Sequence, residues 1–164
     1  MTDRLLAIYL QDHLAGATGG LELARRAHGA NEGTPFGEFL ARLADEIEED
    51  RDVLIEIMES LDVSQDKVKN ALGWGAEKLG RLKPNGQFTG YSPLSRVVEL
   101  EGLTVGVRGK LSLFENLRAT FGEEVAGRNL DGLIVRANRQ LEELTEFRTE
   151  AARAAFEDEA TRVA

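Results

Sequence analysis

The sequence predicts an all-α protein: a bundle of four long helices in a single domain that spans residues 1–164. Three observations lead to this fold class. Apolar residues recur at the spacing of one helix face in four long stretches, and no stretch shows the alternation of a half-buried strand. The only three prolines, at positions 35, 84 and 93, stand between these stretches. The chain is also long enough to bury a core without covalent cross-links.

The first helix is predicted over residues 3–27. Asp3 is a suitable N-cap, and a glycine-containing segment ends the helix. Its apolar face consists of Leu6, Leu10, Leu14, Ala17, Leu21 and Ala24. The second helix is predicted over residues 35–61, because Thr34 is a good N-cap and Pro35 suits the first helical position.

A short helix is predicted over residues 64–82, followed by a loop with glycine and proline turn signals. The third long helix is predicted over residues 93–121, because Ser92 and Pro93 repeat the pattern of a capping residue followed by proline. The fourth long helix is predicted over residues 124–159. Its inward face consists of Leu130, Leu133, Ile134, Ala137, Leu141, Leu144, Phe147 and Ala151.

The lengths of the connections predict how the helices are arranged. About seven residues join the first two helices and two or three join the last two, so each pair is expected to be antiparallel. About 30 residues, including the short helix, lie between the pairs. Such a connection can run back along the bundle and leave the second and third long helices parallel, which is the ferritin-like arrangement with one long crossover. A plain up-down-up-down bundle is the alternative.

Glycines inside two of the predicted helices suggest a close contact between them. Each glycine in a helix interior lowers helix stability by about 1 kcal/mol relative to alanine, so glycines at these positions suggest a structural role. Gly16 and Gly20 in the first helix, and Gly102 and Gly106 in the third, are spaced four residues apart and therefore share a helix face. We expect them to let the two backbones approach closely. The alternative is that both helices kink at these positions.

The composition excludes several classes of function. The chain has no cysteine, which rules out disulfides, zinc ribbons, iron–sulfur clusters and thiol catalysis. Its formal net charge of −9 disfavours nucleic acid and anionic membranes as partners. No apolar run approaches the ~18 residues of a membrane span, and the N-terminus lacks a secretion signal, so a cytoplasmic location is expected. Motifs for nucleophilic catalysis or nucleotide binding are also absent from the sequence.

Charge is distributed unevenly along the chain. Residues 34–61 contain nine acids and two bases, a net charge of −7, whereas residues 64–83 contain five bases and two acids, a net charge of +3. A charged outer helix face is the ordinary explanation. Association into a homo-oligomer is the other, with the basic segment of one copy against the acidic helix of the next. Trp74, Phe88 and Tyr91 would then be apolar anchors, although they equally suit covering the bundle's own core.

A candidate metal site lies at the middle of the predicted bundle. Ferritin-like di-metal sites use Glu-x-x-His pairs, and neither His13 nor His28 follows a glutamate by three residues. The cluster that remains is His13, Glu46, Asp50 and Glu101, each in or beside an apolar stripe. It could bind one iron, manganese or zinc ion, or be a hydrogen-bonded group that fixes helix register without a cofactor. We favour the second interpretation and expect Asp50 or Glu46 to be the partner of His13.

Two segments carry a resemblance to a known family. The segment DHLAGATGGLELARR in the first helix, followed by TPFGEFLARLADEIEEDRDVL, resembles an uncharacterised family of small bacterial, mainly actinobacterial, proteins with a ferritin-like helical bundle. The resemblance covers residues 3–158 and implies the fold, without implying an activity. The wider ferritin-like class uses Glu-x-x-His pairs, from which this sequence departs at both expected helices.

The function expected from the sequence is therefore that of a non-catalytic binding or structural module without a competent di-iron centre. The alternative is a metal-binding protein, or a metal-dependent oxidoreductase, that uses the mid-bundle cluster of histidine and carboxylates.

Overall fold

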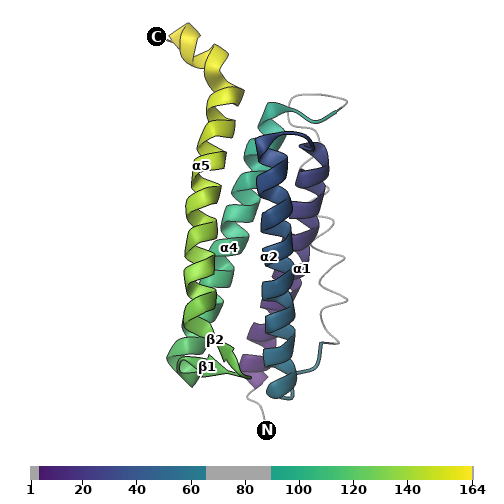
Figure 1. Cartoon of the computed structure of the whole chain (residues 1–164), viewed down its shortest axis with the longest axis vertical. Coiled ribbons are helices and arrows are strands. Elements are labelled where there is room, and N and C mark those ends of the chain that lie inside the picture. The colour runs from purple at the N-terminus through teal and green to yellow at the C-terminus, as the bar shows by residue number, and fades with distance from the viewer. Residues whose placement is uncertain (1–3, 66–89, 164) are drawn as a thin grey trace.

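The computed structural model of the chain describes residues 4–65 and 90–163 (Figure 1), and nearly all of them are helical. The elements, in chain order, are α1 Arg4–Ala30, α2 Pro35–Ser60, α4 Pro93–Phe121, β1 Glu124–Val125, β2 Arg128–Asn129 and α5 Leu130–Val163. The prediction of an all-α helical bundle is therefore confirmed for these residues. The short helix predicted at 64–82 lies almost wholly outside them, as do Trp74 and Phe88.

The helices form two antiparallel pairs, α1 with α2 and α4 with α5 (Figure 1). α1 also lies against α4 in the opposite direction. Near the start of α1, Tyr9 accepts a hydrogen bond from Asn116 near the end of α4, while at the other end Asn31 accepts one from Arg96. As a result, α2 and α4 run in the same direction, although residues 61–92 separate them in the chain.

The starts of α2 and α4 follow from local sequence signals. The Thr34 hydroxyl accepts a hydrogen bond from the Gly37 backbone N–H at 3.2 Å, and Pro35 occupies the first turn. At α4, Ser92 and Ser95 form a reciprocal capping box, again with proline in the first turn. Both starts agree with the sequence prediction, because capping depends on residues that are close together in the chain.

The start of the last helix differs from the prediction. Residues 124–129, predicted as the first turns of a helix over 124–159, form instead a two-stranded antiparallel hairpin, so the expected absence of strands is wrong here. The two turn residues, Ala126 and Gly127, have φ angles of 52° and 69°, as a tight two-residue hairpin turn requires. An α-helix cannot continue through such residues, and α5 begins at Leu130.

The core consists of two apolar clusters stacked along the bundle. The cluster next to the α1–α2 turn contains Phe39, whose ring stacks on Phe147 of α5 with 4.3 Å between centroids. The cluster next to the hairpin contains Phe114 of α4. Apolar burial in these clusters provides the main driving force for packing the helices together. Between the clusters, buried Asp50 and Gln140 bring polar groups into the middle of the bundle.

Most of the helical glycines do not mark the expected close contact. A Cβ atom at Gly102 would lie 3.1 Å from Leu23 Cδ2, so α1 and α4 are close at that position. At Gly16, Gly20 and Gly106, a Cβ would meet no described atom outside its own helix turn within 4 Å. The prediction of close packing is therefore wrong for these three glycines. They border open space among the described helices.

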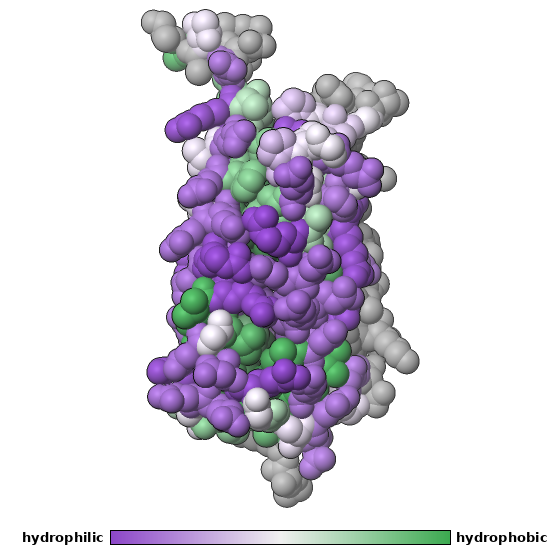
Figure 2. All heavy atoms as spheres, viewed as in Figure 1, coloured by the Kyte–Doolittle hydropathy of each residue, from purple (hydrophilic) through white to green (hydrophobic). Residues whose placement is uncertain are grey.

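The outer face formed by α2 and α5 is strongly polar. Figure 2 shows hydrophilic side chains across the middle of this face, with hydrophobic side chains visible below them. No described helix contains an 18-residue stretch apolar enough to cross a membrane.

Candidate functional site

A buried polar layer connects three helices at the middle of the bundle. The Lys110 ammonium on α4 donates to Asp50 Oδ2 on α2 and to Gln140 Oε1 on α5, each at 2.5 Å. The side chain of Asp50 is 1% exposed and that of Lys110 is 12% exposed. On the far side of Asp50, Arg136 Nη1 donates to Oδ1 at 3.2 Å. The buried carboxylate therefore has a positive charge on both sides, as burial of an ionised group requires.

The polar layer continues from the core to the surface between α2 and α5. Gln140 Nε2 donates to Glu46 Oε2 at 2.8 Å, and Arg139 Nη2 donates to Glu46 Oε1 at 2.5 Å. One turn away, Arg136 also donates to Glu49 at 2.8 Å. The two helices thus contact each other here mainly through long side chains, which produces the hydrophilic band in Figure 2.

The electrostatic environment shifts the pKa values of Lys110 and Glu46 in this layer. Burial lowers the pKa of Lys110 below its ordinary value, and the nearby Asp50 carboxylate only partly opposes this effect. For Glu46, burial raises the pKa, but the hydrogen bonds from Gln140 and Arg139 outweigh it, and the pKa lies below its ordinary value. The side chains of Lys110 and Glu46 are therefore both held by hydrogen bonds within the layer.

The four residues predicted to form a metal site are not brought together. Glu46 and Asp50 lie in the polar layer, where amide and cationic donors already occupy their oxygens. Glu101 is exposed, and His13 lies on α1, half-buried. Across residues 4–65 and 90–163, no group of three or more histidine or carboxylate side chains is arranged to hold a metal ion.

The predicted partner of His13 is also not found. Within the described part of the chain, its ring makes an edge-on contact with Tyr9, at 4.5 Å between centroids and 71° between planes, and no hydrogen bond to Asp50 or Glu46. Asp50 turns toward Lys110 and Arg136 instead. Burial lowers the pKa of His13, and the charge of Asp12 opposes this shift.

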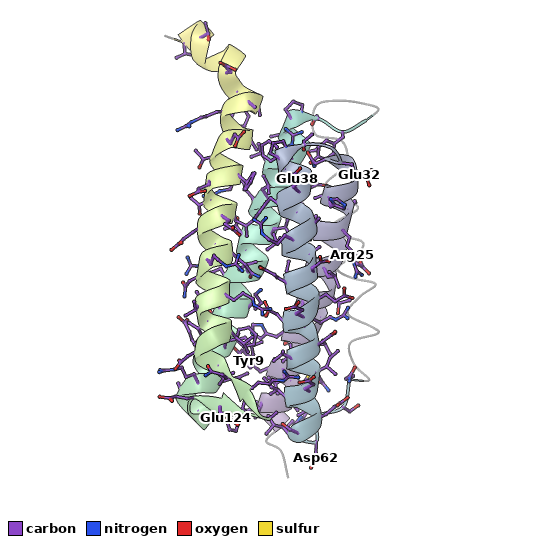
Figure 3. All side chains as sticks on the ribbon, in the orientation of Figure 1. Tyr9, Arg25, Glu32, Glu38, Asp62 and Glu124 are labelled. Carbon is purple, nitrogen blue, oxygen red and sulfur yellow. The ribbon has the colours of Figure 1, made fainter. Side chains whose placement is uncertain are left out.

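A cavity of about 440 Å³ lies between α1, α2 and α4, next to this layer. Its apolar walls are formed chiefly by Ala17, Ile47, Leu54, Leu103, Val107 and Phe114. The polar groups on its surface include Tyr9, His13, Asp50 and Lys110. In Figure 3, Tyr9 lies toward the end of the bundle that carries Asp62 and Glu124.

The open glycines explain why space remains between these helices. Gly16 and Gly20 of α1 and Gly106 and Gly109 of α4 all line the cavity, and a Cβ at each would meet nothing described within 4 Å. Interiors are otherwise filled by interdigitating side chains, with few voids larger than a water molecule. The four missing side chains therefore leave room for a molecule that is not part of the described chain.

A second polar network lies at the α1–α2 turn and has a structural role. The buried Asn31 side chain donates to the Ala27 carbonyl at 2.7 Å and to Tyr91 Oη at 2.9 Å. Tyr91 in turn donates to Glu99 at 2.8 Å, and burial, together with this carboxylate, raises the pKa of Tyr91 to about 12. Tyr91 is thus half-buried and hydrogen-bonded within its own chain, which does not favour a role as an exposed anchor for another copy.

Sequence reasoning missed Lys110 and Gln140, the residues that complete the polar layer. The signal was present: Lys110 stands between Val107 and Leu111 in the apolar stripe of its helix, and Gln140 stands beside Leu141. A polar side chain within an apolar stripe predicts a buried partner, because an unpaired buried donor or charge is costly. The sequence does not say which residue that partner is.

Comparisons of this chain with family models, curated proteins and solved structures found no match.

Proposed function

We propose that this protein is a ferritin-like bundle that acts as a non-catalytic binding module and holds a small ligand in the cavity between α1, α2 and α4. The observation that carries the proposal is the cavity itself. Its volume of about 440 Å³ lies in the range of small-molecule sites, which are typically lined by apolar residues with a few polar groups. The glycines that border it keep it open at a cost in helix stability of about 1 kcal/mol each.

The ferritin-like part of the proposal is supported by the helix directions. Two antiparallel pairs with α2 parallel to α4 match a bundle with one long crossover. In such bundles, inward carboxylates at mid-height hold two metal ions. Here the inward carboxylates of Glu46 and Asp50 face the Gln140 amide and the Lys110 ammonium. An ammonium group supplies the positive charge that a metal ion would otherwise bring.

Metal analysis distinguishes this proposal from a metal-dependent function. We expect protein purified without chelator to contain no stoichiometric iron, manganese or zinc when it is analysed by mass spectrometry, because Lys110 occupies the carboxylate. The same analysis of protein that has been reconstituted with each metal and then desalted tests whether the protein can retain added metal. One equivalent of metal that is lost in the Asp50→Asn variant would overturn the non-metal interpretation.

Occlusion of the cavity tests ligand binding directly. We expect the wild type to bind the two-ring probe 2-naphthol with saturable heat in a calorimetric titration, and the Gly106→Leu variant to lose at least tenfold in affinity. Gly106 lines the cavity and a Cβ there would meet nothing described within 4 Å, so we expect the leucine side chain to occupy part of the cavity. Gly29→Leu is the matched control, because Gly29 is exposed and does not line the cavity. Equal binding by both variants would contradict the proposal.

A further inference from the structure

We propose that the ligand of this cavity is an uncharged, flat ring compound with one hydrogen-bonding group, and that His13 receives that group. The inference rests on the proposed binding function and adds the chemical class of the ligand. Three features of the cavity carry it: the glycines of α1 and α4 that line it, the pairing of its charges, and the environment of the His13 ring.

The shape of the cavity favours a flat ligand body. Gly16 and Gly20 lie one turn apart on α1, and Gly106 and Gly109 lie one turn apart on α4. These two helices are neighbours in the bundle. Because the four glycines carry no side chain, both helices present bare backbone at these positions, between the side chains that form the other walls. Flat rings make their largest contact with flat surfaces, so a ring system gains more apolar contact here than a branched chain of the same size.

The charges at the cavity favour an uncharged ligand. Asp50 is already held by Lys110 and by Arg136, and Arg51 is held by Asp52 at 2.8 Å. The remaining carboxylate among the described lining residues, Asp12, is exposed to solvent. A charged ligand would leave water without gaining a buried, unpaired partner of opposite sign among the described lining residues, and burial of an uncompensated charge is strongly unfavourable.

The His13 ring supplies the polar contact. It lines the cavity half-buried, and no hydrogen bond reaches either ring nitrogen from the described residues. Tyr9 holds the ring edge-on, and the Tyr9 hydroxyl is itself fixed by the Asn116 amide at 2.9 Å. A neutral imidazole offers one donor and one acceptor, which a single hydroxyl or amide on the ligand satisfies.

Three two-ring probes of similar size test this assignment in calorimetric or fluorescence titrations of the full chain: 2-naphthol, 2-naphthoate and 2-methylnaphthalene. We expect 2-naphthol to bind at least tenfold more tightly than the charged 2-naphthoate. The His13→Phe variant keeps a ring against Tyr9 but lacks both nitrogens. We expect this variant to bind 2-naphthol with about fivefold lower affinity, which corresponds to the loss of one hydrogen bond. Its affinity for 2-methylnaphthalene should change less than twofold.

The outcomes separate the ligand class from the proposed function. Equal affinity for 2-naphthoate and 2-naphthol would overturn the uncharged class, and equal effects of His13→Phe on 2-naphthol and 2-methylnaphthalene would overturn the role of His13. In either case, the proposed binding function would still be supported if the Gly106→Leu variant lost its affinity for the probes. Failure of the folded wild type to bind any of the three probes would overturn the binding function itself, and the inference with it.

Discussion

At the scale of single residues, Asp50 and Lys110 are both withdrawn from water, and each depends on the other. The ammonium lies 2.5 Å from the carboxylate, and the side chain of Asp50 is 1% exposed. Such a pair adds little stability relative to apolar residues of the same shape, but removal of one member leaves a charge without its partner. We therefore expect the polar layer to act mainly by specifying which residues of α2, α4 and α5 meet.

We expect the Lys110→Met substitution to lower the free energy of unfolding by about 3 kcal/mol, because Asp50 would keep only Arg136 as a neutralising partner. The double variant Lys110→Met with Asp50→Leu should recover most of this loss, since no buried charge remains. Urea unfolding followed by circular dichroism measures both values.

Arg108→Met on the same helix is the control for that measurement. Arg108 is exposed, so its loss should change the unfolding free energy by less than about 0.5 kcal/mol. If Lys110→Met behaved like this control, the layer would have no role in stability. If the double variant were less stable than Lys110→Met alone, the explanation by an unpaired charge would be wrong.

At the scale of elements, the turn between α1 and α2 depends on the absence of a side chain at Gly37. A Cβ there would lie 2.2 Å from the Asn31 backbone oxygen, which is far inside van der Waals contact. The same turn is held by the Thr34 cap and by the Asn31 side chain, so the backbone has few ways to move aside. The tightness of this turn keeps α1 and α2 side by side.

We expect Gly37→Ala to destabilise the protein by about 1–3 kcal/mol through overpacking against this backbone. The matched control is Gly132→Ala. Each of these glycines donates its N–H to the side chain of the residue three positions earlier, at the start of α2 and of α5 respectively. A Cβ at Gly132 would make only an ordinary contact of 3.8 Å, so that variant should gain up to about 1 kcal/mol. Thermal melts of the two variants should therefore shift in opposite directions; parallel shifts would contradict this account.

At the scale of the whole molecule, the acidic charge of α2 is largely neutralised within the chain. Glu48 pairs with Arg25 of α1, Glu49 with Arg136 of α5, and Glu56 with Arg128 of the hairpin. The sequence suggested that this charge could recruit a basic segment of another copy. The described contacts supply intramolecular partners for it instead, and a homo-oligomer stays a prediction.

We expect the sedimentation coefficient to be the same at low salt and at about 1 M salt, where charges are screened beyond about 3 Å. The reason is that α2 has few unpaired charges left for association. Constant bundle helicity by circular dichroism at both salt concentrations is the control. A dimer at low salt that dissociates at high salt would support association through the acidic helix.

The sequence alone determined the features that depend on neighbours along the chain. The N-caps and prolines at the starts of α2 and α4 are local, and the helical spacing of apolar residues arises from the geometry of a single helix. The hairpin before α5 was missed because its strands are only two residues long, too short for an alternating pattern to be recognised.

Only the tertiary structure decided what the candidate site contains. Spacing along each helix places His13, Asp50 and Glu46 near the middle of the bundle. It does not determine whether Asp50 faces Lys110 or His13, because this depends on how three helices are rotated about their axes, and the apolar stripe of a single helix does not fix those rotations. The same holds for the glycines: a residue without a side chain permits either close contact or open space, and the distance between helices, set by their other side chains, selects the cavity.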